Sequence, residues 1–302
     1  MNKKTILVLN MGMKSIRSII FDEKGNKLAS AAVPIITSLT GEHVTQVPAE
    51  WWEKACRVIR ETVADVGNVS VDYLTVTSSS SCLVCVDKNG EALLPCMMVS
   101  DKRAKAESDF MKEMPVFAKV KEKTGLGMDA SLLIPKALWV KNHEREIYEK
   151  TDKLLTPNDY LILKFTGRYV TDYMNAHKWH YDMEHKRYPV ELLEETGIRL
   201  DLLPEVTNPG DSIGRVSEKA AEETGLTPKT EVVISTYDAI CSFVGSGVLK
   251  EGEAGDVSGT VTVFRAVSGQ KKTISADKIQ QIPYYEGGIH IIGGSNNLGG
   301  GL

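Results

Sequence analysis

The stretch from 231 to 248 constrains the fold more than any other, because it reads as a buried strand that runs directly into a helix. A short β-branched run is followed by small residues with apolar side chains at helical spacing. These apolar positions are Ile240, Phe243, Val244 and Val248. Asp238 lies at the junction. Ligands of open α/β sheets bind at the carboxyl ends of strands, so Asp238 is a candidate both for a helix N-cap and for a catalytic carboxylate.

The rest of the chain reads as an opening β-meander, then alternating helices and strands, then a second glycine hairpin that echoes the first. The predicted strands are 5–10, 15–22, 27–36, 73–77 and 83–87, with two more on either side of a glycine turn within 255–268. The predicted helices are 48–66, 192–196 and 218–224, with further helix starts at Pro135 and Pro157. This order predicts two α/β domains that face each other across a cleft.

Composition narrows the class of partner. The 302 residues carry a net charge of −4 with Lys and Arg scattered, which argues against nucleic acid and favours a small molecule. No apolar run approaches the roughly 18 residues of a membrane span, so we expect no membrane partner. The odd number of cysteines, five, lies in apolar segments, which favours reduced thiols and a cytoplasmic protein.

Two clusters of residues have a spacing or composition found in metal or redox sites. Cys82 and Cys85 have the spacing of a redox or zinc motif but lie in a strand-like run without a second pair, so structural thiols are favoured. His177, Trp179 and His180 could form an aromatic or metal cluster, but no carboxylate spacing completes a metal site. We therefore expect these three side chains to serve packing.

Several segments together resemble the FGGY-family carbohydrate kinases, most closely the xylulokinase-like members. They are the N-terminal hairpin, 135–140, 152–161, Thr166-Gly167, Thr171-Asp172 and the Asp238 stretch, in order and with the family's spacings. The resemblance spans nearly the whole chain. It implies an α/β fold of the actin-like, ribonuclease-H-like ATPase type, with 1–248 as the sugar-binding domain and 249–302 as the start of a second, ATP-binding domain.

The resemblance also implies roles for individual residues. Asp238 falls on the family's catalytic aspartate, which takes the proton of the attacking sugar hydroxyl. At the start of a helix, Asp238 is expected to stay ionised at neutral pH, because the helix dipole favours its charged form. The implied cofactors are ATP and magnesium. The residues implied for nucleotide binding are Asn10, Gly12, Met13, Lys14 and Arg17 in a first phosphate turn, and Gly259 and Thr260 in a second.

The sugar site is implied at two places. Ser79, Ser80 and Ser81 stand where relatives often carry a Gln-Met-His-Gly-like segment, and these serines are either sugar contacts or a polar turn between strands. Asp101 and Arg103 match an Asp-x-Arg element near the sugar; the alternative is a surface pair at a helix start.

The sequence departs from the family in two respects. Asn10 replaces an aspartate that helps to hold magnesium, and a neutral amide would hold the ion only weakly, through water. Relatives are also roughly half as long again or more, so the second domain is expected to be incomplete. We therefore expect residues beyond Ser268 to pack poorly or to pair with a neighbouring molecule.

The leading hypothesis is a sugar kinase that transfers the γ-phosphate of ATP to a hydroxyl of a ketose, polyol or related sugar. The alternative is a catalytically weak or inactive relative that binds sugar as a sensor or scaffold. A third hypothesis is an actin-like assembly protein that shares the fold alone. The identity of the sugar stays open, as does the choice between a monomer and a homodimer.

Overall fold

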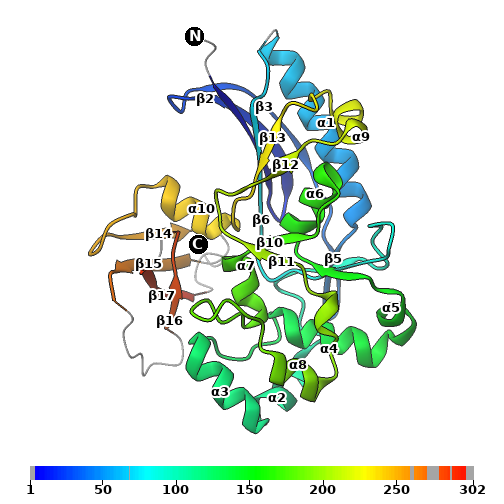
Figure 1. Cartoon of the computed structure of the whole chain (residues 1–302), viewed down its shortest axis with the longest axis vertical. Helices are drawn as coiled ribbons and strands as arrows, with labels where there is room; N and C mark the ends of the chain where they lie inside the picture. Colours follow the sequence, from blue (N-terminus) through cyan, green and yellow to red (C-terminus); the bar gives the residue numbers. More distant parts are fainter. Residues whose placement is uncertain (1–3, 68, 259–261, 271–278, 286–287, 297–302) are drawn as a thin grey trace.

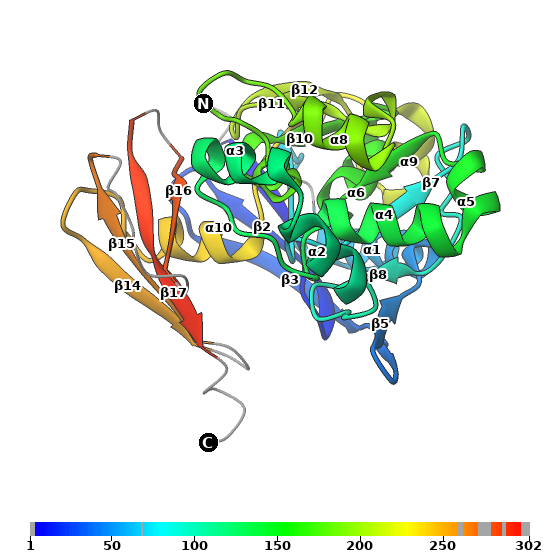
Figure 2. The same ribbon diagram turned by 90° about the horizontal axis from the view of Figure 1, so that it is seen from below.

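The computed structural model describes residues 4–67, 69–258, 262–270, 279–285 and 288–296. A large α/β lobe carries the N-terminus, and a smaller antiparallel sheet lies beside it. Helix α10 (Asp238–Gly245) leads from the large lobe into the small sheet (Figure 1). Figure 2 shows the small sheet standing apart from the helical part of the large lobe, with α10 between them.

The central sheet of the large lobe has six strands in the order β12-β13-β6-β1-β2-β3. Strands β1, β2 and β3 form an antiparallel meander, β6 and β13 run parallel to β1, and β12 is an antiparallel edge strand. The predicted meander is therefore confirmed. The strand bounds are β1 (Thr5–Met11), β2 (Ser15–Asp22), β3 (Lys27–Pro34), β6 (Tyr73–Ser78), β12 (Ser212–Arg215) and β13 (Glu231–Val233).

One face of this sheet is buried beneath helices. Alternate residues of β1, namely Leu7, Leu9 and Met11, point into this core, as the period of two in a strand requires. The covering helices are α1 (Pro48–Val66), α6 (Pro157–Thr166) and α9 (Glu218–Thr224). The bounds of α1 and α9 agree with the sequence prediction. Trp51 is the fully buried tryptophan of α1, whereas its neighbour Trp52 lies half-buried against Phe165.

A second hydrophobic core holds the helical part of the large lobe together. Its helices are α2 (Lys105–Lys112), α3 (Pro115–Thr124), α4 (Leu133–His143), α5 (Arg145–Lys150) and α8 (Val190–Thr196). The helix start predicted at Pro135 is wrong by two residues, because α4 begins at Leu133. The start predicted at Pro157 is confirmed by a capping box, in which Thr156 and Asp159 satisfy each other's backbone N–H groups.

Short elements complete the large lobe. They are β4 (Ser38–Thr40), β5 (His43–Gln46), β7 (Val84–Val86), β8 (Cys96–Met97), β9 (Lys153–Leu155), β10 (Val170–Asp172), β11 (Glu205–Thr207), α7 (Tyr173–Ala176), and the 3₁₀ helices η1 (His177–Trp179) and η2 (Leu200–Leu202). All five cysteines are free thiols; four are buried and Cys241 is half-buried. Within the described residues, no helix combines the length and the apolar character that crossing a membrane requires.

The small sheet has the order β14-β15-β17-β16, with every pair antiparallel. The expectation that the chain beyond Ser268 packs poorly is wrong for the described residues, because β17 pairs with β15 and β16 pairs with β17 within the same chain. Phe243 and Val248 pack with Val267 and Ile291 in a core shared by α10 and the small sheet. Gly259 and Thr260 lie outside the described residues. The bounds are β14 (Ala254–Ser258), β15 (Thr262–Ser268), β16 (Gln280–Pro283) and β17 (His290–Asn296).

Candidate functional site

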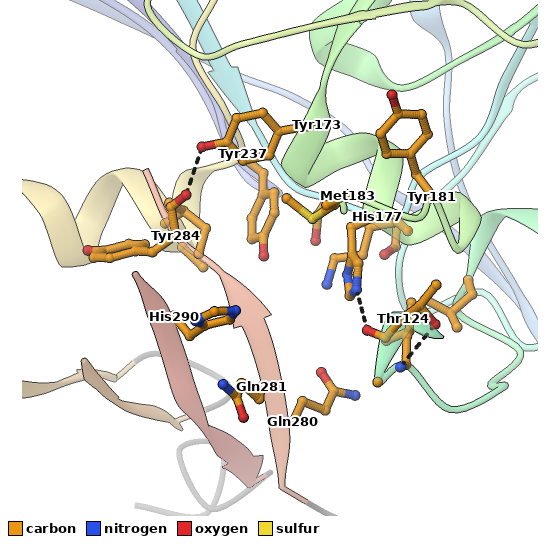
Figure 3. A pocket seen from close by; sticks show the side chains of 18 of the residues that line it. Thr124, Tyr173, His177, Tyr181, Met183, Tyr237, Gln280, Gln281, Tyr284 and His290 are labelled. Atoms are coloured by element: carbon orange, nitrogen blue, oxygen red, sulfur yellow. Dashed lines mark hydrogen bonds between the residues drawn. The ribbon is translucent and has the colours of Figure 1, made fainter. Parts of the chain in front are cut away.

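A pocket of about 2300 Å³, which we call the cleft, opens between the large lobe and the small sheet. Figure 3 shows Tyr173, His177 and Tyr237 on the large-lobe side, facing Gln281 and His290 of the small sheet. A site between two lobes is a common location for small-molecule chemistry. The predicted residues that line the cleft are Ser79, Ser80, Ser81 and Asp238.

Asp238 is the first residue of α10, and Tyr237 occupies the N-cap position. The interpretation of Asp238 as the N-cap is therefore wrong by one residue. Its Oδ1 accepts a hydrogen bond from the Ala239 N–H at 2.7 Å, and its Oδ2 accepts one from the Ser79 hydroxyl at 3.2 Å. The carboxylate thus stays close to the end of β6 while it lines the cleft.

Burial raises the pKa of the Asp238 carboxyl, and the hydrogen bonds from Ala239 and Ser79 act in the opposite direction. The helix dipole alone would lower this pKa, so the net shift runs against the expectation from the sequence. Desolvation outweighs the opposing effects because the carboxyl is half-buried rather than surrounded by water. A raised pKa makes the carboxylate a stronger base.

The end of β6 fixes the segment that precedes Asp238. The Thr77 hydroxyl donates to the carbonyl of Thr236 at 2.8 Å. Strand β13 ends at Val233, so residues 234–237 continue as an extended connection to α10. The hydrogen bond from Thr77 therefore ties this connection to the central sheet and helps to set the position of Asp238.

The serine segment after β6 is held by a buried lysine that the sequence reading missed. Lys136 of α4 has no exposed surface, and its Nζ donates to the carbonyls of Ser81 at 2.6 Å and Met98 at 2.7 Å. Burial lowers the pKa of Lys136 to about 8. Ser81 has φ of 59°, an uncommon value for a residue with a side chain. The available signal was a lysine within the otherwise apolar run 132–140.

Asp101 and Arg103 form a buried pair, so the interpretation as a surface pair is wrong. Arg103 Nε lies 2.9 Å from Asp101 Oδ1, and Nη2 lies 2.7 Å from Oδ2. The same carboxylate accepts the N–H of Val44, and the guanidinium lies 4.9 Å from the centre of the Trp139 ring. Neither residue is part of the cleft lining, and their contact with sugar stays a prediction.

The predicted first phosphate turn connects β1 to β2, where the N–H of Gly12 donates to the carbonyl of Ser15 at 3.0 Å. Asn10 pairs with Arg17 on β2 and with Thr77 on β6, so the three residues share one face of the sheet. The Thr77 hydroxyl also contacts Cys241 of α10, so Asn10 lies on the α10 side of the sheet. None of Asn10, Gly12, Met13, Lys14 and Arg17 lines the cleft, and their nucleotide contacts stay predictions.

The described part of the chain offers no ready-made cluster of metal ligands. No group of three His, Cys, Asp or Glu side chains there could hold a metal ion. Asn10 offers a neutral amide oxygen, which is a weak ligand for a hard cation. The residues present therefore do not fit a preformed magnesium site.

His177 and His180 are buried, as the packing interpretation predicts, and the His177 ring also borders the cleft. Nε2 of His177 lies 3.0 Å from the carbonyl of Thr124, and Nε2 of His180 lies 3.3 Å from that of Gly127. Burial lowers the pKa of His177 to about 4 and that of His180 to about 3. Both rings are therefore neutral at physiological pH, and they donate through Nε2 to these carbonyls.

Two carboxyls in the segments that carry the family resemblance are buried in the large lobe. Asp159 Oδ2 accepts the Thr156 N–H at 2.8 Å, and Asp172 caps α7 through the N–H groups of Met174 and Asn175. Burial raises the pKa of Asp159 to about 7 and that of Asp172 to about 6. These motif residues support the structure of the lobe and do not line the cleft.

Asp159→Asn is expected to flatten the pH dependence of stability. In the wild type, the unfolded state loses the Asp159 proton near pH 3.8 while the folded state keeps it to about pH 7, so stability falls as pH rises through this window. The loss is on the order of a few kcal/mol, at about 1.4 kcal/mol per pKa unit. Urea unfolding at pH 4.5 and 7.5 measures it. Asp65→Asn, at an exposed position of α1, is the control; equal slopes in wild type and Asp159→Asn would contradict the assignment.

With this geometry established, comparison with known proteins identifies the fold. Residues 5–245 match the N-terminal domain of the FGGY family of carbohydrate kinases. The chain is 30% identical over 270 residues to an autoinducer-2 kinase of Klebsiella pneumoniae, covering 84% of this chain and 49% of that protein. It is 26% identical over 275 residues to the xylulose kinase of Bacillus subtilis, covering 89% and 54%.

A crystal structure of a xylulose kinase from Lactobacillus acidophilus superposes with a TM-score of 0.91 at 20% identity, covering 98% of this chain and 61% of that one. The chain thus spans about half the length of the curated relatives it matches. Its fold is α/β of the actin-like, ribonuclease-H-like ATPase type. The match to more than two thirds of the chain shows that it belongs to the FGGY family of carbohydrate kinases.

Proposed function

We propose that the protein transfers the γ-phosphate of ATP to a hydroxyl of a sugar, a ketose or polyol among them, with Asp238 as general base. The observation that carries this proposal is the Asp238 carboxylate, which lines a cleft between two lobes and carries a raised pKa. A base is most effective when its pKa approaches the working pH. Family membership supports the reaction class.

Phosphoryl transfer requires little covalent chemistry from the protein. In phosphoryl transfer the protein mainly positions the reactants and stabilises charge. Asp238 would accept the proton of the substrate hydroxyl as its oxygen attacks the γ-phosphorus and ADP departs. The hydroxyls of Ser79, Ser80 and Ser81 line the same cleft and can donate to or accept from sugar oxygens. ATP would supply the phosphoryl group, and magnesium would be held chiefly by the phosphates.

Asn10 favours a second candidate function, a weakly active or inactive relative that binds sugar as a sensor or scaffold. Asn10 lies on the α10 side of the central sheet, in one row with Thr77. A carboxylate at this position would attract the magnesium of a nucleotide, whereas the amide carries no charge. Magnesium-dependent ATP binding supports the kinase, and sugar binding without it supports the sensor.

Asn10→Asp is expected to strengthen magnesium-dependent ATP binding by about fivefold to tenfold, since contacts to charged groups are worth more than neutral ones. Calorimetry with ATP, with and without magnesium, measures this change. Asn89→Asp, in an exposed turn that does not line the cleft, is the matched control and should leave binding unchanged. If a sugar panel gives no phosphorylation by the full-length protein and Asn10→Asp restores none, the kinase proposal fails.

A further inference from the structure

Among the described residues, two half-buried cations line the cleft without an ion pair to a carboxylate. Lys178 lies on η1 of the large lobe, and Arg265 lies on β15 of the small sheet. In the described part of the chain, neither side chain forms an ion pair with a carboxylate, whereas many other Lys and Arg side chains do. A partly desolvated charge without a counter-ion is costly unless a ligand neutralises it.

Lys178 lies over the ring of Tyr237, the residue that precedes the proposed base. Its Nζ is 5.2 Å from the centre of the Tyr237 ring, and Tyr237 immediately precedes Asp238. Burial lowers the pKa of Lys178 to about 8, and the charge of Arg265 lowers it further in the same direction. The side chain is therefore mainly cationic at neutral pH and lies within the electrostatic reach of Arg265.

Arg265 has room to extend into the cleft. Its cross-strand partners are Gly255 on β14 and Gly293 on β17, so no side chain stands beside it on either neighbouring strand. Nη1 donates to the carbonyl of Phe264 at 3.0 Å, and the guanidinium makes no other hydrogen bond to the residues that the structure describes. Burial lowers the pKa of Arg265, which nevertheless stays charged.

The other lysines of the cleft lining differ from these two, as do the glutamates near them in the sequence. Lys121, Lys123 and Lys186 are exposed, as are the carboxylates of Glu122 and Glu184. Water screens such exposed charges, so they need no ligand. Lys178 and Arg265 are the half-buried cations of the lining, and they come from opposite sides of the cleft.

We propose that Lys178 and Arg265 form an anion subsite that binds a carboxylate of the acceptor, so that the preferred substrate is a sugar acid rather than a neutral ketose or polyol. The inference rests on the proposed function. A guanidinium matches a carboxylate in two parallel hydrogen bonds, and an ammonium adds a point charge. The subsite belongs to the acceptor because Asp238 and Ser79 line the same cleft, whereas Lys14 and Arg17 of the phosphate turn do not.

Calorimetry with D-gluconate and D-glucitol tests the inference, because this pair differs in having a carboxylate or a CH₂OH group at one end. The wild-type chain is expected to prefer gluconate. Lys178→Met and Arg265→Met should each weaken gluconate binding by about tenfold to a hundredfold, the value of a charged hydrogen bond, and leave glucitol binding unchanged. Lys121→Met, an exposed cation of the same cleft, should change neither.

Lys178→Arg and Arg265→Lys preserve charge and should retain most of the preference, which separates loss of charge from loss of fold. Equal affinity for gluconate and glucitol would overturn the subsite and leave the proposed function standing. Loss of ATP affinity in the Met variants with unchanged gluconate affinity would also overturn it and assign the cations to nucleotide phosphates. If the full-length protein prefers gluconate but phosphorylates no sugar, the proposed kinase function is overturned and the proposed anion subsite still stands.

Discussion

Asp238→Asn is expected to lower the turnover of sugar phosphorylation by about 10²- to 10⁴-fold, the usual contribution of a general base. The amide retains the shape: its oxygen can accept from the Ala239 N–H, and its NH₂ group can donate to the Ser79 hydroxyl, at the positions of the two bonds that hold the carboxylate. It cannot accept the proton of a hydroxyl. The Michaelis constant for the sugar should change much less than the turnover, because the variant loses an interaction that forms in the transition state.

A coupled ATP assay on the full-length protein measures this loss. Ser79→Ala is an informative companion, because it removes a hydrogen bond that lowers the pKa of Asp238. Its acidic limb in the pH–rate profile should move to higher pH, while its maximal rate stays far above that of Asp238→Asn. Turnover within tenfold of the wild type in Asp238→Asn would remove Asp238 from the role of base.

Lys136→Met is expected to destabilise the fold by about 2–5 kcal/mol. Methionine keeps the length of the side chain, but it leaves the carbonyls of Ser81 and Met98 without their buried donor. Each buried acceptor left unsatisfied costs about 1–3 kcal/mol. Because these carbonyls belong to the serine segment and to the chain after β8, the variant should also loosen the cleft wall that carries Ser79.

Urea unfolding measures the change in the free energy of unfolding. Lys141→Met is the matched control, because Lys141 lies further along α4 and donates to the carbonyl of Thr196 at 2.7 Å from a half-exposed position. It should cost about 1 kcal/mol or less, since water can replace the donor. An equal decrease in the free energy of unfolding in Lys136→Met and Lys141→Met would show that the buried contacts of Lys136 contribute no more to stability than the half-exposed contact of Lys141.

Local signals predicted much of the large lobe. Alternating apolar residues and short glycine turns defined the meander, and proline with a periodic apolar face defined α1 from Pro48 to Val66. Thr156 and Pro157 marked the start of α6 because a capping box uses residues only three apart. Such features depend on neighbours in the sequence, so the sequence displays them directly.

The site was harder to predict, because its residues are far apart in the sequence and come together only in the folded chain. Ser79 and Asp238 were both candidates, yet no local pattern shows that they share a hydrogen bond across 159 residues of sequence. Lys178 and Arg265 come from different lobes, and each looks like an ordinary surface cation when read alone. The order of β16 and β17 likewise depends on the pairing of β17 with β15 and of β16 with β17 rather than on local propensity.

The placement of α10 links the strength of the base to the motion of the lobes. Asp238 begins a helix whose Phe243 packs in the core of the small sheet, whereas Ser79 follows β6 of the large lobe. Burial is the main cause of the raised pKa of Asp238. Separation of the lobes would expose the carboxylate to water and lower its pKa, which weakens it as a base. A substrate that draws the lobes together would therefore strengthen the base that removes the substrate's own proton.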